Sequence, residues 1–308
     1  MKPQTQITTN PLFTGALLAL LATIIWSGNF IVSRGLGQMI HPATLAFLRW
    51  STALIILLPF AMGPTWKQRH LVKKHFRYLA LTSFLGITVF NTLIYTAGRT
   101  TGALNMALIS TSIPVFIILF ARLFQSEAIT MRKLAGMCAA VAGVLLIITR
   151  GDFRMLTALT FAAGDFWMLL AAALFAAYSI LVRNKPKELG QATFLTASFG
   201  IGLGMLIPWS MGELMLYGAP DLTPTILGAV LYIGLGASLL AYMCWNGAIS
   251  RIGPAKAGMV YYSLPLFSGL EAWLLLGEPV GWFHLLGGVS IVGGIYAATR
   301  VTKLQPPK

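Results

Sequence analysis

Long apolar runs separated by short polar segments make up most of the chain. Ten of these runs are long enough to cross a membrane, because a spanning helix needs about 20 mainly apolar residues. They lie at about 13–33, 42–62, 78–98, 102–124, 131–149, 162–182, 192–211, 225–249, 253–276 and 282–300. The pattern therefore predicts an all-α integral membrane protein with ten transmembrane helices.

One stretch of this pattern occurs twice. Residues 97–149 and 248–300 align without a gap at an offset of 151, with thirteen identities. The identities include the pairs Pro114/Pro265, Glu127/Glu278, Gly136/Gly287 and Gly143/Gly294. A second offset of 149 extends the repeat over the first two helices of each half. We therefore divide the chain into two five-helix repeats, 1–150 and 151–308, an organisation typical of transporters.

The basic residues indicate how the two repeats are oriented. Five helices is an odd number, so the second repeat must be inverted relative to the first. Lys and Arg accumulate on cytoplasmic loops, and sixteen of the 22 lie on one side of the predicted membrane against four on the other. The remaining two, Arg49 and Arg122, lie within helices. The bias predicts that both termini are cytoplasmic.

Composition supports this class and excludes others. The 308 residues are 57% hydrophobic and 10% charged, whereas soluble domains carry about 25% charged residues. The net charge of +14 lies in loops beside apolar runs, so it predicts no nucleic-acid binding. Cys138 and Cys244 have no metal-ligand spacing. The chain contains neither an HExxH nor a GxSxG motif, and we expect no enzyme, metal or cofactor.

Three segments of the chain resemble a known family. The ends of the two repeats read SEAITMRKLAGMCAAVAGVLLI and LGEPVGWFHLLGGVSIVGGI. They are similar to EamA-type repeats of the drug/metabolite transporter (DMT) superfamily. The opening IIWSGNFIVSRGL resembles that of YddG-type amino-acid exporters. The resemblance implies a multi-pass exporter of small metabolites in the cell inner membrane, with a central cavity between the halves.

Four polar residues in the third and eighth apolar runs are candidates to line the substrate route. Asn91 and Tyr95 are four residues apart, as are Tyr242 and Asn246, so each pair shares a helix face. At the 151 offset the two residue types appear in swapped order. Uncharged hydrogen-bonding groups are costly in lipid unless they face protein or a wet cavity. Hydrogen bonding between helices is the alternative role.

Aromatic residues in the other helices could form an amphipathic wall for an apolar or aromatic solute. The wall candidates, with the amide Asn29, are Trp26, Asn29, Phe175, Tyr178, Trp245 and Tyr261. Core packing is the alternative for each aromatic residue taken singly.

Two prolines lie at equivalent mid-helix positions. Pro114 and Pro265 each lack an N–H and displace the carbonyl group four residues earlier. They could act as hinges with freed acceptors, or as fixed kinks that help the bundle to pack.

Few charges lie inside the predicted helices. Arg49 could pair with a substrate carboxylate, but a structural role at the outer surface is favoured. Glu271 and Asp165 are the candidates for proton coupling, although each lies near a surface where a solvated carboxylate costs little. Glu127 and Glu278 are expected to cap the helix that follows each of them.

The fifth and tenth apolar runs carry small residues at helical spacing. Gly136, Ala140 and Gly143 in the fifth correspond to Gly287, Ile291 and Gly294 in the tenth. Small residues let helices approach closely. Packing inside the monomer is favoured over a dimer contact.

These features together predict a carrier. The resemblance implies that this carrier exports amino acids, aromatic or other neutral ones among them, or related small metabolites, and the repeat predicts alternating access. The alternative is a proton-coupled multidrug exporter. The expected partners are a small-molecule substrate and the lipid bilayer, with the protein a monomer or a weak homodimer.

Overall fold

The computed structural model describes residues 10–276 and 280–299, and in this part of the chain the regular structure is entirely helical. The helices are α1 (Pro11–Met39), α2 (Pro42–Lys67), α3 (Arg69–Lys74), α4 (Phe76–Ser83), α5 (Phe90–Thr100), α6 (Ala103–Ser110), α7 (Ser112–Gln125), α8 (Met131–Ile148), α9 (Ala163–Arg183), α10 (Gln191–Tyr217), α11 (Pro224–Tyr232), α12 (Ala241–Ile252), α13 (Pro254–Tyr261), α14 (Leu264–Leu276) and α15 (Trp282–Thr299). A short 3-10 helix spans Phe153–Leu156, and π-helices span Phe84–Val89 and Ile233–Leu240.

Within these residues, nine helical segments are long and apolar enough to cross a membrane. They correspond to nine of the ten predicted runs. The remaining run, 253–276, contains the shorter helices α13 and α14, so the count of ten stays a prediction. Several boundaries were predicted too short, since α2 continues to Lys67 and α10 to Tyr217.

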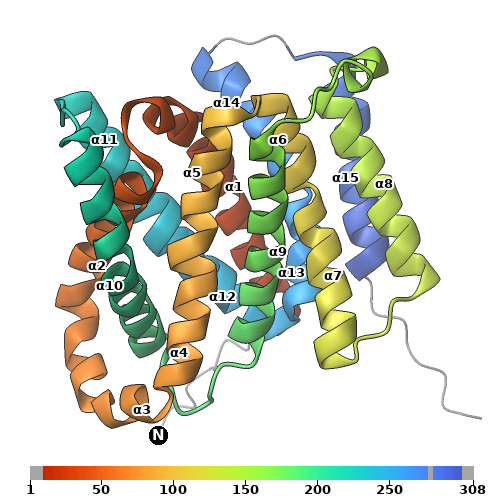
Figure 1. The fold of residues 1–308 in the computed structure, drawn as a ribbon. Coiled ribbons are helices and arrows are strands. Elements are labelled where there is room, and N and C mark those ends of the chain that lie inside the picture. The colour runs from red at the N-terminus through yellow and green to blue at the C-terminus, as the bar shows by residue number, and fades with distance from the viewer. Residues whose placement is uncertain (1–9, 277–279, 300–308) are drawn as a thin grey trace, which may run out of the picture.

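The helices pack as a bundle in which α1, α5, α9 and α12 lie at the centre (Figure 1). Helices α2, α10 and α11 lie on one side of this centre, and α7, α8 and α15 on the other. The closest pairings include α2 with α10, α8 with α15 and α1 with α12. In the first two of these pairs, the partners are equivalent helices of the two predicted repeats.

Glycines bring α8 and α15 into close contact. A Cβ atom on Gly136 would lie 2.5 Å from the carbonyl oxygen of Gly294, and one on Gly143 would lie 2.6 Å from that of Gly287. Real Cβ atoms do not approach other atoms so closely, so only glycine fits at these positions. These small residues therefore pack inside the molecule, which is the role that the sequence analysis favoured over a dimer contact.

The two π-helices occupy equivalent places in the third and eighth apolar runs. Phe84–Val89 joins α4 to α5, and Ile233–Leu240 joins α11 to α12. Short π-helical segments inside α-helices are rare and frequently mark functional sites. The sequence pattern predicted neither of them.

Both mid-helix prolines follow a break in the helix. Helix α6 ends at Ser110 before Pro114, and α13 ends at Tyr261 before Pro265. Around the first break, the Ser110 and Ser112 hydroxyls donate to carbonyl groups of the preceding turn. Near the second break, Ser263 donates in the same way. The helix is thus interrupted before both prolines, whereas their role as hinges stays a prediction.

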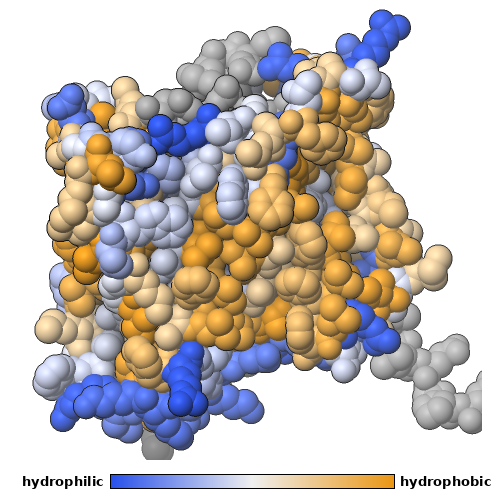
Figure 2. All heavy atoms as spheres, viewed as in Figure 1, coloured by the Kyte–Doolittle hydropathy of each residue, from blue (hydrophilic) through white to orange (hydrophobic). Residues whose placement is uncertain are grey.

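The middle of the visible face is largely hydrophobic, and hydrophilic residues lie towards both ends of the bundle (Figure 2). The end where α3 lies carries a cluster of basic residues, among them Arg69, Lys73 and Lys74 of α3. We call this end the basic end. There the Glu188 carboxylate lies 2.9 Å from Lys74 Nζ and 3.2 Å from His75 Nε2. The hydrogen bond from Lys74 and the other bonds to this carboxylate lower the pKa of Glu188 to about 2. Glu188 thus holds the loop before α10 against α3.

The expected cap of α8 is corrected by the structure. The residue that caps this helix is Thr130, whose hydroxyl accepts the Lys133 amide at 3.2 Å. Glu127 instead forms an ion pair with the Lys133 ammonium group at 3.4 Å. Thr130 directly precedes the first residue of α8, where its hydroxyl can accept from a free amide of the first turn. Glu127 lies three residues earlier in the sequence. Glu278 lies outside the described residues.

Candidate functional site

A buried aromatic cluster occupies the centre of the bundle around Trp26 of α1. The Trp26 ring centroid lies 5.4 Å from that of Phe175, 5.9 Å from Tyr242, 5.3 Å from Trp245 and 6.1 Å from Tyr261. All five side chains are buried. Helices α1, α9, α12 and α13 thus bring together residues that lie far apart in the sequence.

The polar residues predicted on α5 and α12 lie beside this cluster. The Asn91 amide is 3.5 Å from the Tyr242 hydroxyl, which itself donates to the Gly86 carbonyl at 2.6 Å. The Tyr178 hydroxyl donates to Asn246 Oδ1 at 2.9 Å. The Asn246 amide nitrogen is buried without a hydrogen-bond partner among the described residues.

Most of the proposed substrate-route residues therefore meet in one place. The contact between Asn91 and Tyr242 links the two halves directly, whereas the bond between Tyr178 and Asn246 joins α9 to α12 within the second half. Asn29 is half-buried on α1, one turn beyond Trp26. These positions are compatible with a substrate route and with hydrogen bonding between helices.

Arg49 of α2 lies in the core, and the favoured prediction of an outer-surface role is wrong. Its side chain is 2% exposed. Its guanidinium donates to the Tyr95 hydroxyl at 3.0 Å, to the Ala237 carbonyl at 3.0 Å and to the Ser238 hydroxyl. These acceptors are all neutral, and among the described residues no carboxylate lies within ion-pair distance of it.

The Ala237 carbonyl connects Arg49 to the aromatic cluster. The indole nitrogen of Trp26 donates to the same oxygen at 2.9 Å. Ala237 lies in the π-helix Ile233–Leu240, where the widened turn leaves this carbonyl open to donors from other helices. The sequence offered no signal for this contact beyond the unusual arginine in an apolar run.

The two candidate coupling acids have different surroundings. Asp165 caps α9, where its carboxylate accepts from the Ala162 amide at 2.9 Å, from Asn105 at 3.0 Å and from the Thr101 hydroxyl. Glu271 Oε1 accepts from the Ser27 hydroxyl at 2.8 Å. Glu271 Oε2 is buried and has no partner among the described residues. Neither acid is therefore the simple solvated carboxylate that the sequence favoured.

Comparison with known proteins assigns the chain to a family. Residues 13–149 and 162–300 both match the model of the EamA-like transporter family. The chain belongs to this family.

Several relatives of this EamA-family protein match it over nearly their whole length. An uncharacterized transporter of Archaeoglobus fulgidus is 30% identical over 92% of this chain and 96% of the relative. A probable terminal-alkyne amino-acid exporter of Streptantibioticus cattleyicolor is 25% identical over 93% and 94%. A probable amino-acid metabolite efflux pump of Salmonella typhimurium is 25% identical over 91% and 92%. The protein is therefore a multi-pass membrane transporter and not an enzyme.

Proposed function

We propose that this EamA-family transporter exports amino acids, aromatic or other neutral ones among them, or related small metabolites across the cell inner membrane. Two relatives whose names refer to amino-acid export support this proposal. The observation that carries it is the buried guanidinium of Arg49, which has only neutral partners.

The argument from Arg49 is electrostatic. A buried charge is costly unless an opposite charge or a dense set of hydrogen bonds compensates it, and ionisable residues inside membranes are usually functional. Arginine has five N–H donors, and three bonds to protein acceptors are present. A carboxylate, which the guanidinium fork binds in a bidentate manner, is the natural ligand for the rest.

The aromatic cluster supplies the second half of the recognition. Trp26 shares the Ala237 carbonyl with Arg49, so a substrate carboxylate on Arg49 would place its side chain near the rings of Trp26 and Tyr242. Aromatic rings accept apolar and aromatic groups without demanding one shape. A zwitterion with a variable neutral side chain suits this pairing.

Alternating access follows from the repeated architecture. All of the proposed contact residues on α5 and α12 are buried, so a substrate reaches them only when the halves separate on one side. The kinks before Pro114 and Pro265 lie at equivalent places and serve as the hinges in this proposal. The inverted repeat, with both termini in the cytoplasm, lets the same movement open either side.

Transport by purified protein in liposomes tests the proposal. Labelled phenylalanine is exchanged against three competitors: unlabelled phenylalanine, phenethylamine, which lacks the carboxylate, and 3-phenylpropionate, which lacks the amine. We expect phenylalanine to compete best and phenethylamine least. Equal competition by phenethylamine would rule out recognition of the carboxylate.

Variants of two arginines provide the matched controls. Arg49→Gln and Arg49→Lys should reduce exchange, because neither keeps the charged planar fork. Arg122 of α7 is exposed, and Arg122→Gln should leave exchange unchanged. If no amino acid moves in the native protein, amino-acid export is wrong and cationic drugs become the next panel.

The second candidate function is proton-coupled multidrug export. The buried, unpartnered Oε2 of Glu271 favours it, because a carboxylate oxygen without a donor is better accommodated when protonated. Export of a cationic dye that requires both a proton gradient and Glu271 would favour this candidate.

A further inference from the structure

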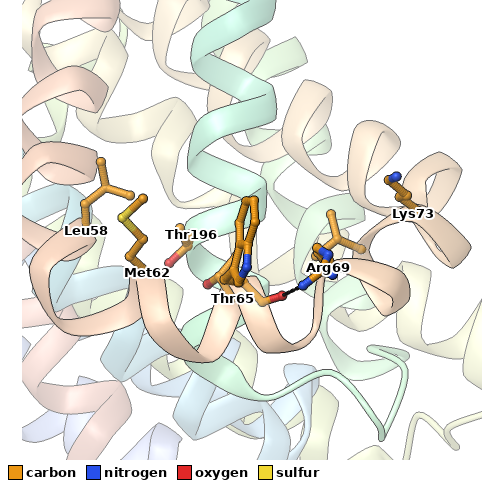
Figure 3. Close-up of a pocket in the computed structure, with 8 residues that line it drawn as sticks. Leu58, Met62, Thr65, Arg69, Lys73 and Thr196 are labelled. Atoms are coloured by element: carbon orange, nitrogen blue, oxygen red, sulfur yellow. Dashed lines mark hydrogen bonds between the residues drawn. The ribbon is translucent and has the colours of Figure 1, made fainter.

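A pocket of about 250 Å³ lies at the basic end between α2, α3 and α10 (Figure 3). Leu58 and Met62 lie towards one end of it, Arg69 and Lys73 lie towards the other, and Thr196 lies between them. The pocket is therefore amphipathic along its length, with an apolar end in the bundle and a cationic end on α3.

The cationic end carries charge that the protein does not neutralise. The Lys73 ammonium group has no hydrogen bond or ion pair with any described residue. The Arg69 guanidinium lies over the Trp66 ring, 5.0 Å from its centroid, and donates to the Trp66 carbonyl at 3.3 Å. No acidic residue lines the pocket. The Glu188 carboxylate forms its ion pair with Lys74 on the same helix α3.

Two further features suit an amphiphilic ligand. The Trp66 side chain is 65% exposed, and exposed tryptophan at a helix end is typical of the membrane–water interface. Thr196 is only 6% exposed, and its hydroxyl has no hydrogen-bond partner among the described residues although it lines the pocket. A buried hydroxyl of this kind is stabilised by an acceptor from a ligand.

We propose that this pocket binds one phospholipid with an anionic headgroup from the leaflet at the basic end. The phosphate lies between Arg69 and Lys73, the Thr196 hydroxyl donates to a glycerol-ester oxygen, and an acyl chain runs along Leu58 and Met62. The charge complementarity selects an anionic over a zwitterionic lipid. The pocket is separate from the substrate cluster, so the proposal does not depend on which solute is carried.

Lipid binding to the detergent-purified full-length protein, followed by native mass spectrometry, tests the proposal. Dioleoyl-phosphatidylglycerol, dioleoyl-phosphatidylcholine and inorganic phosphate are titrated separately. We expect one phosphatidylglycerol to bind more tightly than phosphatidylcholine. Each of Arg69→Gln and Lys73→Gln should weaken phosphatidylglycerol binding about fivefold.

Lys74→Gln is the matched control, because it removes the same charge from the same helix while Lys74 is already paired with Glu188. It should leave the affinity unchanged. An equal loss in Lys74→Gln would show a general charge effect and overturn the site. Equal binding of the two lipids, or displacement by inorganic phosphate at matched concentration, would overturn a lipid as the ligand.

Thr196→Val tests the interior of the pocket without changing any charge. It keeps the shape of the side chain and removes the hydroxyl, and we expect weaker phosphatidylglycerol binding with an unchanged unfolding temperature. Unchanged lipid binding in this variant would exclude the hydroxyl contact and restrict the ligand to the surface cations.

Discussion

The carbonyl oxygens of Gly86 and Ala237, which lie 151 positions apart, each accept side-chain hydrogen bonds from the opposite half of the chain. Gly86 accepts from the Tyr242 hydroxyl at 2.6 Å. Ala237 accepts from Trp26 at 2.9 Å and from Arg49 at 3.0 Å. Both carbonyls lie in π-helices, so each half of the protein inserts donors into a widened turn of the other.

This relationship predicts that Tyr242→Phe destabilises the protein. The variant keeps the ring but leaves the Gly86 carbonyl with one side-chain donor among the described residues, the weak contact from Asn91 at 3.5 Å. Loss of a partner for a buried acceptor costs about 1–3 kcal/mol. The measurement is thermal unfolding in detergent, and Tyr261→Phe is the control because the Tyr261 hydroxyl makes no hydrogen bond with a described residue. Equal unfolding temperatures for the two variants would contradict the role of the Tyr242 bond.

Two neighbouring glycines of α15 give a second prediction. A Cβ atom on Gly294 would lie 2.4 Å from the Gly136 carbonyl oxygen of α8, whereas one on Gly293 would meet nothing within 4 Å. Gly294→Ala should therefore cost about 1–3 kcal/mol through overpacking, and Gly293→Ala should be close to neutral. Thermal unfolding of the two variants under the same conditions measures this difference in stability. A loss of similar size in both would indicate a propensity or lipid effect instead of the α8–α15 contact.

The spanning helices could be predicted because their physical cause is local. Apolar runs of sufficient length and the proline positions are visible in the sequence, and the structure contains nine of the predicted spans and a helix break before each proline. Glycine spacing likewise indicated close helix packing inside the monomer, and the structure shows such packing between α8 and α15. These features depend on nearby residues and on the solvent, and not on the details of the tertiary contacts.

The candidate site was only partly predictable because its decisive contacts are tertiary. The swapped Asn91 and Tyr242 are visible as a pattern, and their meeting follows the repeat. The role of Arg49 depends on a carbonyl freed by a π-helix on another segment, and no residue type specifies such a helix. The Glu213 carboxylate of α10 similarly caps α2 from a distance, accepting the Thr44 amide at 2.7 Å.

A pH prediction concerns Glu188 at the basic end. Its pKa in the folded protein is about 2 because it accepts a hydrogen bond from Lys74, whereas an unfolded glutamate titrates near 4.3. Because the pKa is lower in the folded protein, the ionised Glu188 carboxylate stabilises the folded state above about pH 4.3. This stabilisation is lost as the pH falls towards 2. The unfolding temperature of the native protein should therefore exceed that of Glu188→Gln at pH 6, and the difference should shrink by pH 3. A difference that is constant over this range would contradict the shifted pKa.

The surroundings of Asp165 and Glu271 predict how transport responds to a proton gradient. The Asp165 carboxylate is satisfied by Ala162, Asn105 and Thr101, so Asp165→Asn should act on stability as the loss of a helix cap, at about 1 kcal/mol. The pH dependence of transport by Asp165→Asn should match that of the native protein.

Glu271 should behave differently, because its Oε2 is buried without a donor while Oε1 holds Ser27. If export responds to an imposed proton gradient, Glu271→Gln should abolish that response and retain exchange in the absence of a gradient, since the amide mimics the protonated acid. Liposome transport with and without the gradient measures both variants. A gradient response that survives in Glu271→Gln and disappears in Asp165→Asn would assign coupling to the capped acid, and would mean that a carboxylate with three donors releases them during the transport cycle.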